Sequence, residues 1–483
     1  MSTETAPRHT FFGQPPVLAN LFGVELWERF SFYGMQGILL IYLYYTATRG
    51  GLGLSENTAT SIVGAYGGSV YLATILGAWV ADRLAGPERV LFGSAVLVML
   101  GHISLAVLPG LTGVTTGLIL IAVGSGGVKA TATSLVGTLY DEHDDRRDAG
   151  FSLFYLGINL GALVGPLLTG LLQKNWGFHW GFGLAAVGMA IGLTQYALGR
   201  GRLTGAAREV ANPLPPGRRV PVAVAVAAAA VLVVVLALTG VLRAAYLSDV
   251  VVVLSIVAAV AYFVVILTSR RITGLERRRV LAFIPLFVAS AVFWSLYQQQ
   301  FTVVTIYSDQ RLDRDLLGWE MPVSWVQSIN PVFIIVLSGV FAALWTRLGP
   351  RQPSTPVKFA AGTAIMGVAF LLFLPLAGGG PNSTPLLALA GILLVFTIAE
   401  LLLSPVGLSL STKLAPQAFH TQMVALFFLS VALGTAASGT LANYYSETNE
   451  TAYFGILGAV AVTIGAALAL AARPISRLME GVR

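Results

Sequence analysis

The sequence predicts an all-α membrane protein with fourteen transmembrane helices, arranged as two six-helix bundles with two extra helices between them. Of the 483 residues, 56% are hydrophobic and only 11% are charged, whereas a soluble domain has roughly 25% charged residues. The apolar residues gather in blocks of about 20, the length that a helix needs to cross the hydrocarbon core of a bilayer. These blocks group along the chain as six, two and six.

The first six blocks predict an N-terminal six-helix bundle at 18–199. The polar linker RGRLTGAAREVANPLPPGRR, rich in Pro and Arg, follows this bundle at 200–219. The expected helices lie at 18–47, 56–82, 90–109, 112–139, 149–173 and 178–199.

The remaining eight blocks complete the fold. Two plain helices, nearly all Ala, Val and Leu, are expected at 220–242 and 247–269, followed by the basic loop SRRITGLERRR. We therefore expect a linker with two additional helices at 200–279 and a C-terminal six-helix bundle at 280–473. The last six helices are expected at 280–308, 321–347, 356–376, 385–413, 419–444 and 452–472.

Basic residues are distributed unequally between the two sides of the expected membrane. When successive loops alternate between the sides, 22 of the 29 Lys and Arg residues fall on the side of the two termini and five on the other. Lys and Arg accumulate in cytoplasmic loops. Both termini are therefore predicted to be cytoplasmic, in a multi-pass protein of the plasma (inner) membrane, and the net charge of +7 needs no nucleic acid to explain it.

Metal and cofactor sites are not expected. The chain has no cysteine, which excludes disulfides and thiolate metal sites. DEHDDRRD (141–148) carries carboxylates and a histidine, but a solvated loop explains it better than a metal site.

A short internal repeat indicates how the helices are organised. DRLAGPER (82–89) ends the second helix, and the similar TRLGPRQ (346–352) ends the second helix of the second half. Major facilitator transporters are built from parallel repeats of this kind, with the substrate site near the bilayer midplane. The repeat, the helix count and the orientation together favour the major facilitator fold.

The first helix carries charges within an apolar stretch. In ELWERFSFYG, Glu25, Glu28 and Arg29 recur at spacings that place them on one face of a helix, together with Phe32 and Tyr33. Charges inside a membrane helix are costly and usually functional. The alternative is a buried ion pair that merely neutralises itself, but Arg29 can satisfy only one carboxylate well, which leaves one acid in surplus.

Two further charges are expected inside the membrane. Lys129 lies in GSGGVKATATSLVG of the fourth helix, and Glu400 occupies a similar place in the corresponding helix of the second half. Cations in one half and an anion in the other suit a zwitterion, whose carboxylate would meet Arg29 and Lys129 and whose ammonium would meet Glu400. A buried unpaired acid can bind a proton near neutrality, so the residues predict a proton-coupled symporter.

Three segments resemble the signatures of the proton-dependent oligopeptide transporter family, which comprises peptide transporters of the major facilitator superfamily. ELWERFSFYG resembles the family's ExxERFxYY signature. RRDAGFSLFYLGINLGALVGPLLTG (146–170) resembles its fifth-helix signature almost throughout, and ELLLSPVGLSLSTKLAP (400–416) its tenth-helix segment. The resemblance covers essentially the whole chain, and two extra central helices are typical of bacterial members. It implies a secondary transporter, not an enzyme, that imports di- and tripeptides with protons by alternating access.

The resemblance also implies roles for individual residues. Glu25 and Glu28 would take part in proton coupling, with Arg29 and Lys129 as their partners and as ligands of the peptide carboxylate, and Glu400 would bind the peptide amino terminus. The expected partners are small peptides, protons and the lipid bilayer. The other residues expected around the peptide are Tyr33, Tyr71, Asn159, Trp294, Gln298, Asn330, Phe427 and Ser430.

Three departures from the family pattern keep alternatives open. Phe32 replaces a tyrosine of the signature, and Ala130 and Thr131 follow Lys129 where the family often has Pro and Asn. Gln298 stands where many members carry an acid, so that coupling would depend on the first helix. The alternatives are an uncoupled peptide carrier, or the same fold carrying another small zwitterion or a peptide-like drug.

Overall fold

The computed structural model describes residues 10–141, 144, 146–203 and 205–482. Each of the fourteen predicted apolar segments forms a helix. In the first part of the chain these are α1 (Pro16–Tyr44), α2 (Glu56–Val80), α3 (Pro87–Val107), α4 (Gly110–Gly137), α5 (Arg147–Trp176), α6 (Phe178–Gly199), α7 (Pro216–Leu238) and α8 (Leu247–Thr268). In the second part they are α9 (Gly274–Tyr297) continued by α10 (Val303–Gln310), then α11 (Ile329–Leu348), α12 (Thr355–Leu371), α13 (Leu386–Lys413), α14 (His420–Ala442) and α15 (Glu450–Met479).

The described residues contain 13 helical segments that are long and apolar enough to cross a membrane. The remaining predicted span is α1, a 29-residue helix that carries Glu25, Glu28 and Arg29 within its apolar sequence. The fold is therefore the predicted all-helical membrane fold.

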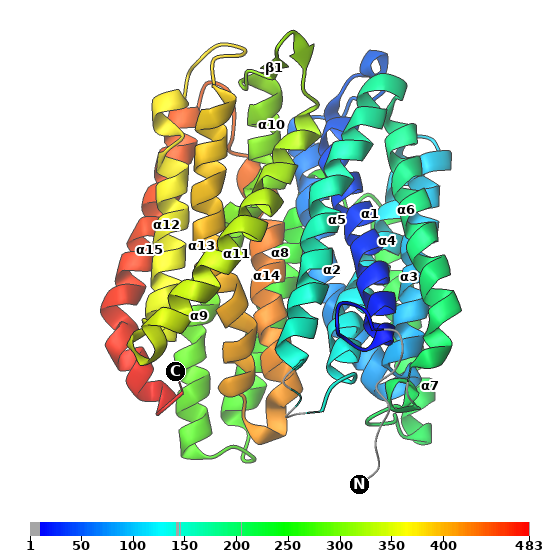
Figure 1. The fold of residues 1–483 in the computed structure, drawn as a ribbon, viewed down its shortest axis with the longest axis vertical. Helices are drawn as coiled ribbons and strands as arrows, with labels where there is room; N and C mark the ends of the chain where they lie inside the picture. Colours follow the sequence, from blue (N-terminus) through cyan, green and yellow to red (C-terminus); the bar gives the residue numbers. More distant parts are fainter. Residues whose placement is uncertain (1–9, 142–143, 145, 204, 483) are drawn as a thin grey trace. The chain divides into compact units, whose positions relative to one another are not determined.

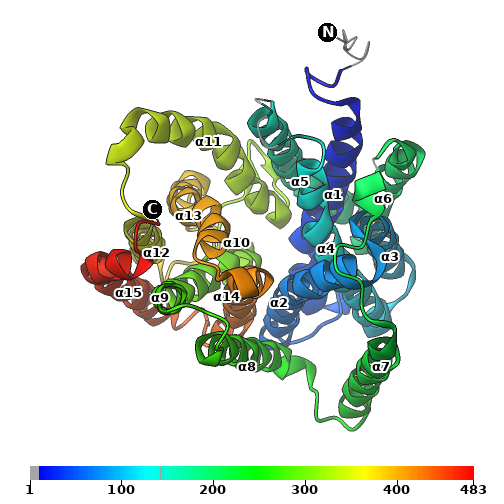
Figure 2. The ribbon, with the colours of Figure 1, turned by 90° about the horizontal axis from the view of Figure 1, so that it is seen from below.

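The chain forms two compact units, residues 1–36 with 73–233 and residues 37–72 with 234–483. Within the first unit, α3 lies alongside both α4 and α6 (Figure 2). Within the second, α12 lies alongside α15 and α13 (Figure 1), and α14 packs on α8 and α9. The extra helix α7 has no buried residue among those described, as its uniformly apolar sequence leads one to expect of a lipid-facing helix.

Glycines in α4 allow close packing of its neighbours. A Cβ atom on Gly126 would lie 2.5 Å from the carbonyl carbon of Ala73 and 2.7 Å from the amide nitrogen of Thr74 on α2. Such distances leave no room for a side chain, so the GSGG sequence before Lys129 serves helix contact.

The helix α9 begins earlier than the sequence analysis predicted. The stretch SRRITGLERRR was expected to be a loop, but helix begins at Gly274 and includes its second half. The reason is a capping box in which Thr273 Oγ1 accepts a bond from the Glu276 amide (3.2 Å) and a Glu276 carboxylate oxygen accepts one from the Thr273 amide (2.7 Å). The prediction was wrong there because the T-x-x-E signature was overlooked.

Two features of the second half were not predicted. The expected continuous helix at 280–308 is interrupted by a 3₁₀ turn at Gln298–Phe301, and Thr302 departs from helical geometry with φ −122° and ψ −100°. A small hairpin pairs β1 (Asp315–Leu316) with β2 (Trp319–Glu320), and its turn residues Leu317 and Gly318 both have positive φ. A 3₁₀ interruption within a long helix often marks a functional hinge.

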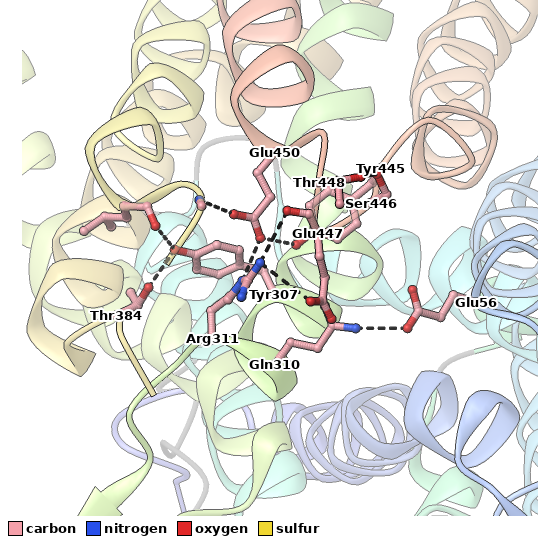
Figure 3. Close-up of polar contacts among 12 residues, drawn as sticks. Glu56, Tyr307, Gln310, Arg311, Thr384, Tyr445, Ser446, Glu447, Thr448 and Glu450 are labelled. Carbon is pink, nitrogen blue, oxygen red and sulfur yellow. Dashed lines mark hydrogen bonds and ion pairs between the residues drawn. The ribbon is translucent and has the colours of Figure 1, made fainter. Parts of the chain in front are cut away.

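Polar side chains join the end of α10 to neighbouring loops and α15 in the second unit (Figure 3). Arg311 Nε donates to Glu450 Oε1 at 3.0 Å, and the Tyr445 hydroxyl donates to the same oxygen at 3.1 Å. The amide of Gly378 donates to Glu450 Oε2 at 2.7 Å. Glu450 is thus a buried carboxylate with hydrogen bonds to both of its oxygens.

Candidate functional site

The charged face of α1 forms a buried cluster in the first unit. Glu25, Glu28 and Arg29 are 3%, 0% and 2% exposed. Arg29 Nε donates to Glu25 Oε1 at 2.7 Å and lies 3.1 Å from Glu28 Oε2. The predicted grouping of these three residues on one helix face is therefore present in the structure.

The two carboxylates differ in their partners. Glu28 accepts a hydrogen bond from the hydroxyl of Ser125 on α4 at 2.6 Å. Within the part of the chain that the structure describes, Glu25 Oε2, Glu28 Oε2 and Arg29 Nη1 have no hydrogen-bond partner. One guanidinium between two acids thus leaves hydrogen-bonding capacity unused, which is costly for buried groups.

Close packing between α1 and α5 fixes the backbone of the cluster. A Cβ atom on Gly161 would lie 2.8 Å from the amide nitrogen of Phe30 and 2.9 Å from Arg29 Cβ, and one on Gly165 would lie 3.0 Å from the amide nitrogen of Gly34. These glycines belong to the segment that carries the fifth-helix signature. The signature therefore has a local physical function, which is to let α5 approach the backbone of α1.

Phe32 lies beside Arg29 and Lys129, the two cations predicted to lie inside the membrane in the first half. Its ring centroid is 5.8 Å from the Arg29 guanidinium carbon and 5.5 Å from Lys129 Nζ. Both distances fall within the range of cation–π attraction. The departure from tyrosine at this position therefore keeps an aromatic face for the two cations while omitting a hydroxyl.

In the second unit, Glu400 on α13 lies within a polar cluster of its own. Its Oε2 accepts hydrogen bonds from the Tyr297 hydroxyl at 2.8 Å and from Asn330 Nδ2 at 3.4 Å. Asn330 Nδ2 also donates to Thr397 Oγ1 at 2.9 Å. Glu400 is 8% exposed and has no ion-pair partner within the described residues, so it is a buried carboxylate held by neutral donors.

Aromatic and small polar residues of the same unit complete the predicted set. Trp294 and Tyr297 make an edge contact with ring centroids 5.2 Å apart, and Gln298 begins the 3₁₀ turn directly after Tyr297. Ser430 Oγ lies 2.8 Å from Ser290 Oγ and donates to the Phe427 carbonyl at 2.7 Å. The predicted residues Trp294, Gln298, Asn330, Glu400, Phe427 and Ser430 all belong to this second unit, and all are buried.

The other three predicted residues lie on α1, α2 and α5. Asn159 on α5, in the first unit, uses its amide to bond the Tyr155 carbonyl one turn earlier at 3.0 Å. Tyr33 is half-buried on α1 in the same unit, and Tyr71 is half-buried on α2 in the second unit. The structure thus groups Arg29 with both glutamates, and Glu400 with Asn330.

Three participants were missed by the sequence analysis, namely Ser125, Tyr297 and Thr397. Each had a weak signal in the sequence. Ser125 precedes Lys129 by four residues and Thr397 precedes Glu400 by three, so each shares a helix face with its charge. Tyr297 directly precedes Gln298 and lies three residues after Trp294.

The arrangement combines buried carboxylates with a buried guanidinium. No group of three His, Asp or Glu side chains that could hold a metal occurs in the described ranges. Buried acids next to fixed cations can instead bind a proton or release their cations to an anionic ligand. This is the chemistry of a transporter.

Comparison with known proteins supports the same reading. Residues 88–460 match the POT family (PTR2). The chain is 40% identical to the di-/tripeptide transporter of Lactococcus lactis subsp. cremoris over 98% of both chains, and 41% identical to the uncharacterized transporter YclF of Bacillus subtilis (strain 168) over 99% of this chain and 98% of YclF.

The solved structures of a peptide transporter are similar over nearly the whole length. Its crystal structure in complex with sulfate gives a TM-score of 0.94 at 44% identity, covering 99% of this chain and 98% of the other. A variant of that transporter in complex with alafosfalin gives 0.93 at the same identity and coverage. The chain therefore belongs to the POT family, the proton-dependent oligopeptide transporters of the major facilitator superfamily.

Proposed function

We propose that this protein imports di- and tripeptides together with protons by alternating access. The observation that carries the proposal is the buried cluster of Glu25, Glu28 and Arg29, which holds more carboxylate than its guanidinium satisfies. Family membership and the similar di-/tripeptide transporter support the substrate class.

Within this proposal, the residues divide by role. Arg29 and Lys129 bind the peptide carboxylate, and Glu400 binds the peptide amino terminus. When the carboxylate of a peptide binds Arg29, the guanidinium is shared between the peptide and the two glutamates. One glutamate then loses part of its contact with Arg29, which favours its protonation. Proton and peptide are linked in this way through Arg29. Tyr33, Tyr71, Asn159 and Asn330 contact the peptide backbone, while Trp294 and Phe427 line pockets for its side chains. Gln298 and Ser430 also line the peptide site.

The domain organisation and orientation are part of the proposal. The N-terminal bundle comprises 18–199, the C-terminal bundle 280–473, and the two extra helices lie at 200–279. Both termini face the cytoplasm of a cell whose plasma membrane holds the protein.

Because the chain has no cysteine, the orientation can be measured with single cysteines. A membrane-impermeant maleimide should label Thr239→Cys in intact cells and Ser269→Cys only after the membrane is opened; the reverse pattern would invert the orientation.

Two other functions rest on specific observations. The complex of the similar transporter with alafosfalin favours peptide-like drugs as further cargo. Gln298, which cannot titrate, favours an uncoupled peptide carrier.

Uptake of labelled dialanine into proteoliposomes distinguishes these functions. We expect accumulation above the external concentration when an inward proton gradient is applied, and only equilibration when it is collapsed. The Gln298→Glu variant serves as comparison. Exchange without accumulation by the wild type, together with accumulation by Gln298→Glu, would identify a carrier whose coupling is broken at position 298. The absence of any peptide transport would exclude peptides as the cargo.

A further inference from the structure

Gly407 on α13 lies against the ring of Phe427 on α14, one of the aromatic residues proposed to line the peptide site. A Cβ atom on Gly407 would lie 3.2 Å from Cζ and 3.3 Å from Cδ2 of this ring, and closer still to Cε2. Carbon atoms in ordinary van der Waals contact are about 3.5–4.0 Å apart. The Phe427 ring therefore occupies the space that any side chain at position 407 would need.

The contact of Gly407 differs from that of glycines at which helix backbones touch. A Cβ atom on Gly434 would lie 2.5 Å from the carbonyl oxygen of Ala291 and 2.9 Å from the amide nitrogen of Ser295, both backbone atoms of α9. The three heavy atoms nearest to a Cβ on Gly407 all belong to the Phe427 ring. A methyl group at position 407 would thus displace a ring, which can turn about its side-chain bonds, and would not require the helices to separate.

The backbone that carries Phe427 is held against α9. Ser430 Oγ donates to the Phe427 carbonyl at 2.7 Å and lies 2.8 Å from Ser290 Oγ on α9. Both serines are buried. Because its main chain has these contacts, Phe427 responds to a change at position 407 by rotation of its ring rather than by movement of α14.

Gly407 faces the same side of α13 as Glu400. Seven residues separate the two, which is nearly two full turns and about 10 Å along the helix axis. Glu400 is the residue proposed to bind the peptide amino terminus, and successive residues of an extended peptide advance by about 3.5 Å. A large side chain on the second residue of a peptide reaches a ring at this distance from Glu400, whereas a side chain on the first residue falls short of it.

We propose that Gly407 sets the size of the side chain that is accepted at the second residue of a peptide, because it leaves room behind the Phe427 ring. The inference rests on the proposed function, in which Phe427 lines a side-chain pocket. With glycine at position 407, the ring lies back against α13. A larger residue there would turn the ring away from α13 and into the pocket, which would then admit only small side chains. Gly407 acts through Phe427 and is therefore a positioning residue.

The test compares Ala-Ala with Ala-Phe, two dipeptides that differ only in their second side chain. Each competes with labelled dialanine for uptake into proteoliposomes, and the ratio of their half-inhibitory concentrations is measured for the wild type, Gly407→Ala and Gly391→Ala. Gly391 is the matched control, since it lies on the same helix and a Cβ atom there would have no atom of the described residues within 4 Å. The ratio is independent of the amount of folded protein, so a loss of stability alone does not change it.

We expect Gly407→Ala to weaken competition by Ala-Phe about tenfold relative to Ala-Ala, the effect of about one methylene in a tight pocket, and Gly391→Ala to keep the ratio within about twofold. Adding Phe427→Leu to Gly407→Ala should restore the wild-type ratio, because leucine is smaller and leaves space for the added methyl group. An unchanged ratio in Gly407→Ala, or an equal change in Gly391→Ala, would overturn the role of Gly407.

Phe427→Leu alone tests the inference if Gly407→Ala does not fold. This variant should favour Ala-Phe over Ala-Ala more than the wild type does, and an unchanged ratio would mean that the Phe427 ring does not limit the second side chain. Failure of the proposed function is distinguishable, since the wild type would then take up no dialanine and both proposals would fall. Normal uptake with unchanged ratios would overturn the role of Gly407 alone.

Discussion

Two buried arginines, Arg29 and Arg311, are each flanked by glutamates, yet their surroundings differ in a way that separates function from structure. Around Arg311, Glu450 has hydrogen bonds to both carboxylate oxygens, from a guanidinium, a tyrosine hydroxyl and a backbone amide. Around Arg29, Glu25 Oε2, Glu28 Oε2 and Arg29 Nη1 have no such partner among the described residues.

The comparison indicates that the ability of a buried ion cluster to bind a proton depends less on its number of charges than on how many of its polar atoms already have hydrogen-bond partners. Protonation of a fully hydrogen-bonded ion pair is unfavourable, because each carboxylate oxygen already accepts a hydrogen bond from a donor. An incompletely bonded group of two acids and one base can accept a proton or a ligand at lower cost. The same fold thus contains one ion pair suited to holding loops together and one suited to transport.

The largest expected effect is from Glu28→Gln. This variant keeps an oxygen for the Ser125 hydroxyl but cannot bind or release a proton, so we expect gradient-driven accumulation of dialanine to be lost while peptide exchange persists. Accumulation and counterflow in the same proteoliposomes provide the measurement. If accumulation survives in Glu28→Gln and fails in Glu25→Gln, the coupling role moves to Glu25.

A second variant, Glu450→Gln, should affect stability instead. Removing one partner of a buried ion pair leaves the other charge uncompensated, which costs about 3 kcal/mol. We expect a lower thermal unfolding temperature in detergent, with the accumulation ratio of the remaining folded protein unchanged. Loss of coupling at normal stability would show that the Arg311 cluster also takes part in transport.

Glu400→Gln should weaken peptide binding. A hydrogen bond between charged groups contributes about 1.5–3 kcal/mol, so the apparent affinity for dialanine should fall by about tenfold or more. An acetylated dipeptide, which lacks the ammonium group, is the matched ligand and should bind both proteins alike. Equal loss for both ligands would argue against contact between Glu400 and the amino terminus.

The smallest expected effect is from Tyr445→Phe. Burial, and then the charge of Glu450, raise the pKa of Tyr445 well above its usual range, so its hydroxyl remains protonated and donates at physiological pH. Its loss should cost about 1 kcal/mol, seen as a small fall in unfolding temperature. Tyr297→Phe, which removes the donor to Glu400, is the contrasting variant and should change the apparent peptide affinity. The comparison fails if both variants alter stability alone.

Much of the fold could be predicted because it depends on long stretches of sequence. Fourteen apolar blocks of membrane-spanning length became helices, and ExxER placed its charges on one helix face. The 3₁₀ interruption at Gln298 and the hairpin at 315–320 escaped because each depends on a few dihedral angles that apolar composition does not encode. The contacts of Ser125 with Glu28 and of Tyr297 with Glu400 depend on how distant helices are rotated against each other, and hydrophobic patterning leaves that rotation undetermined.

The glycines at 157, 161 and 165 of α5 have a mechanical consequence. A Cβ atom on Gly157 would meet the ring of Phe22, and one on Gly161 or Gly165 would meet backbone atoms of α1 at 3.0 Å or less. The two helices therefore touch by their backbones at Gly161 and Gly165, one turn apart. Backbones in such contact cannot slide lengthwise past each other without collision. The portion of α1 that carries Glu28 and Arg29 therefore travels with α5 as one rod, and probes placed on these two stretches should keep a constant separation throughout a transport cycle. A response to a bound proton must then come from rotation of side chains on α1, since the axis of α1 cannot shift without α5.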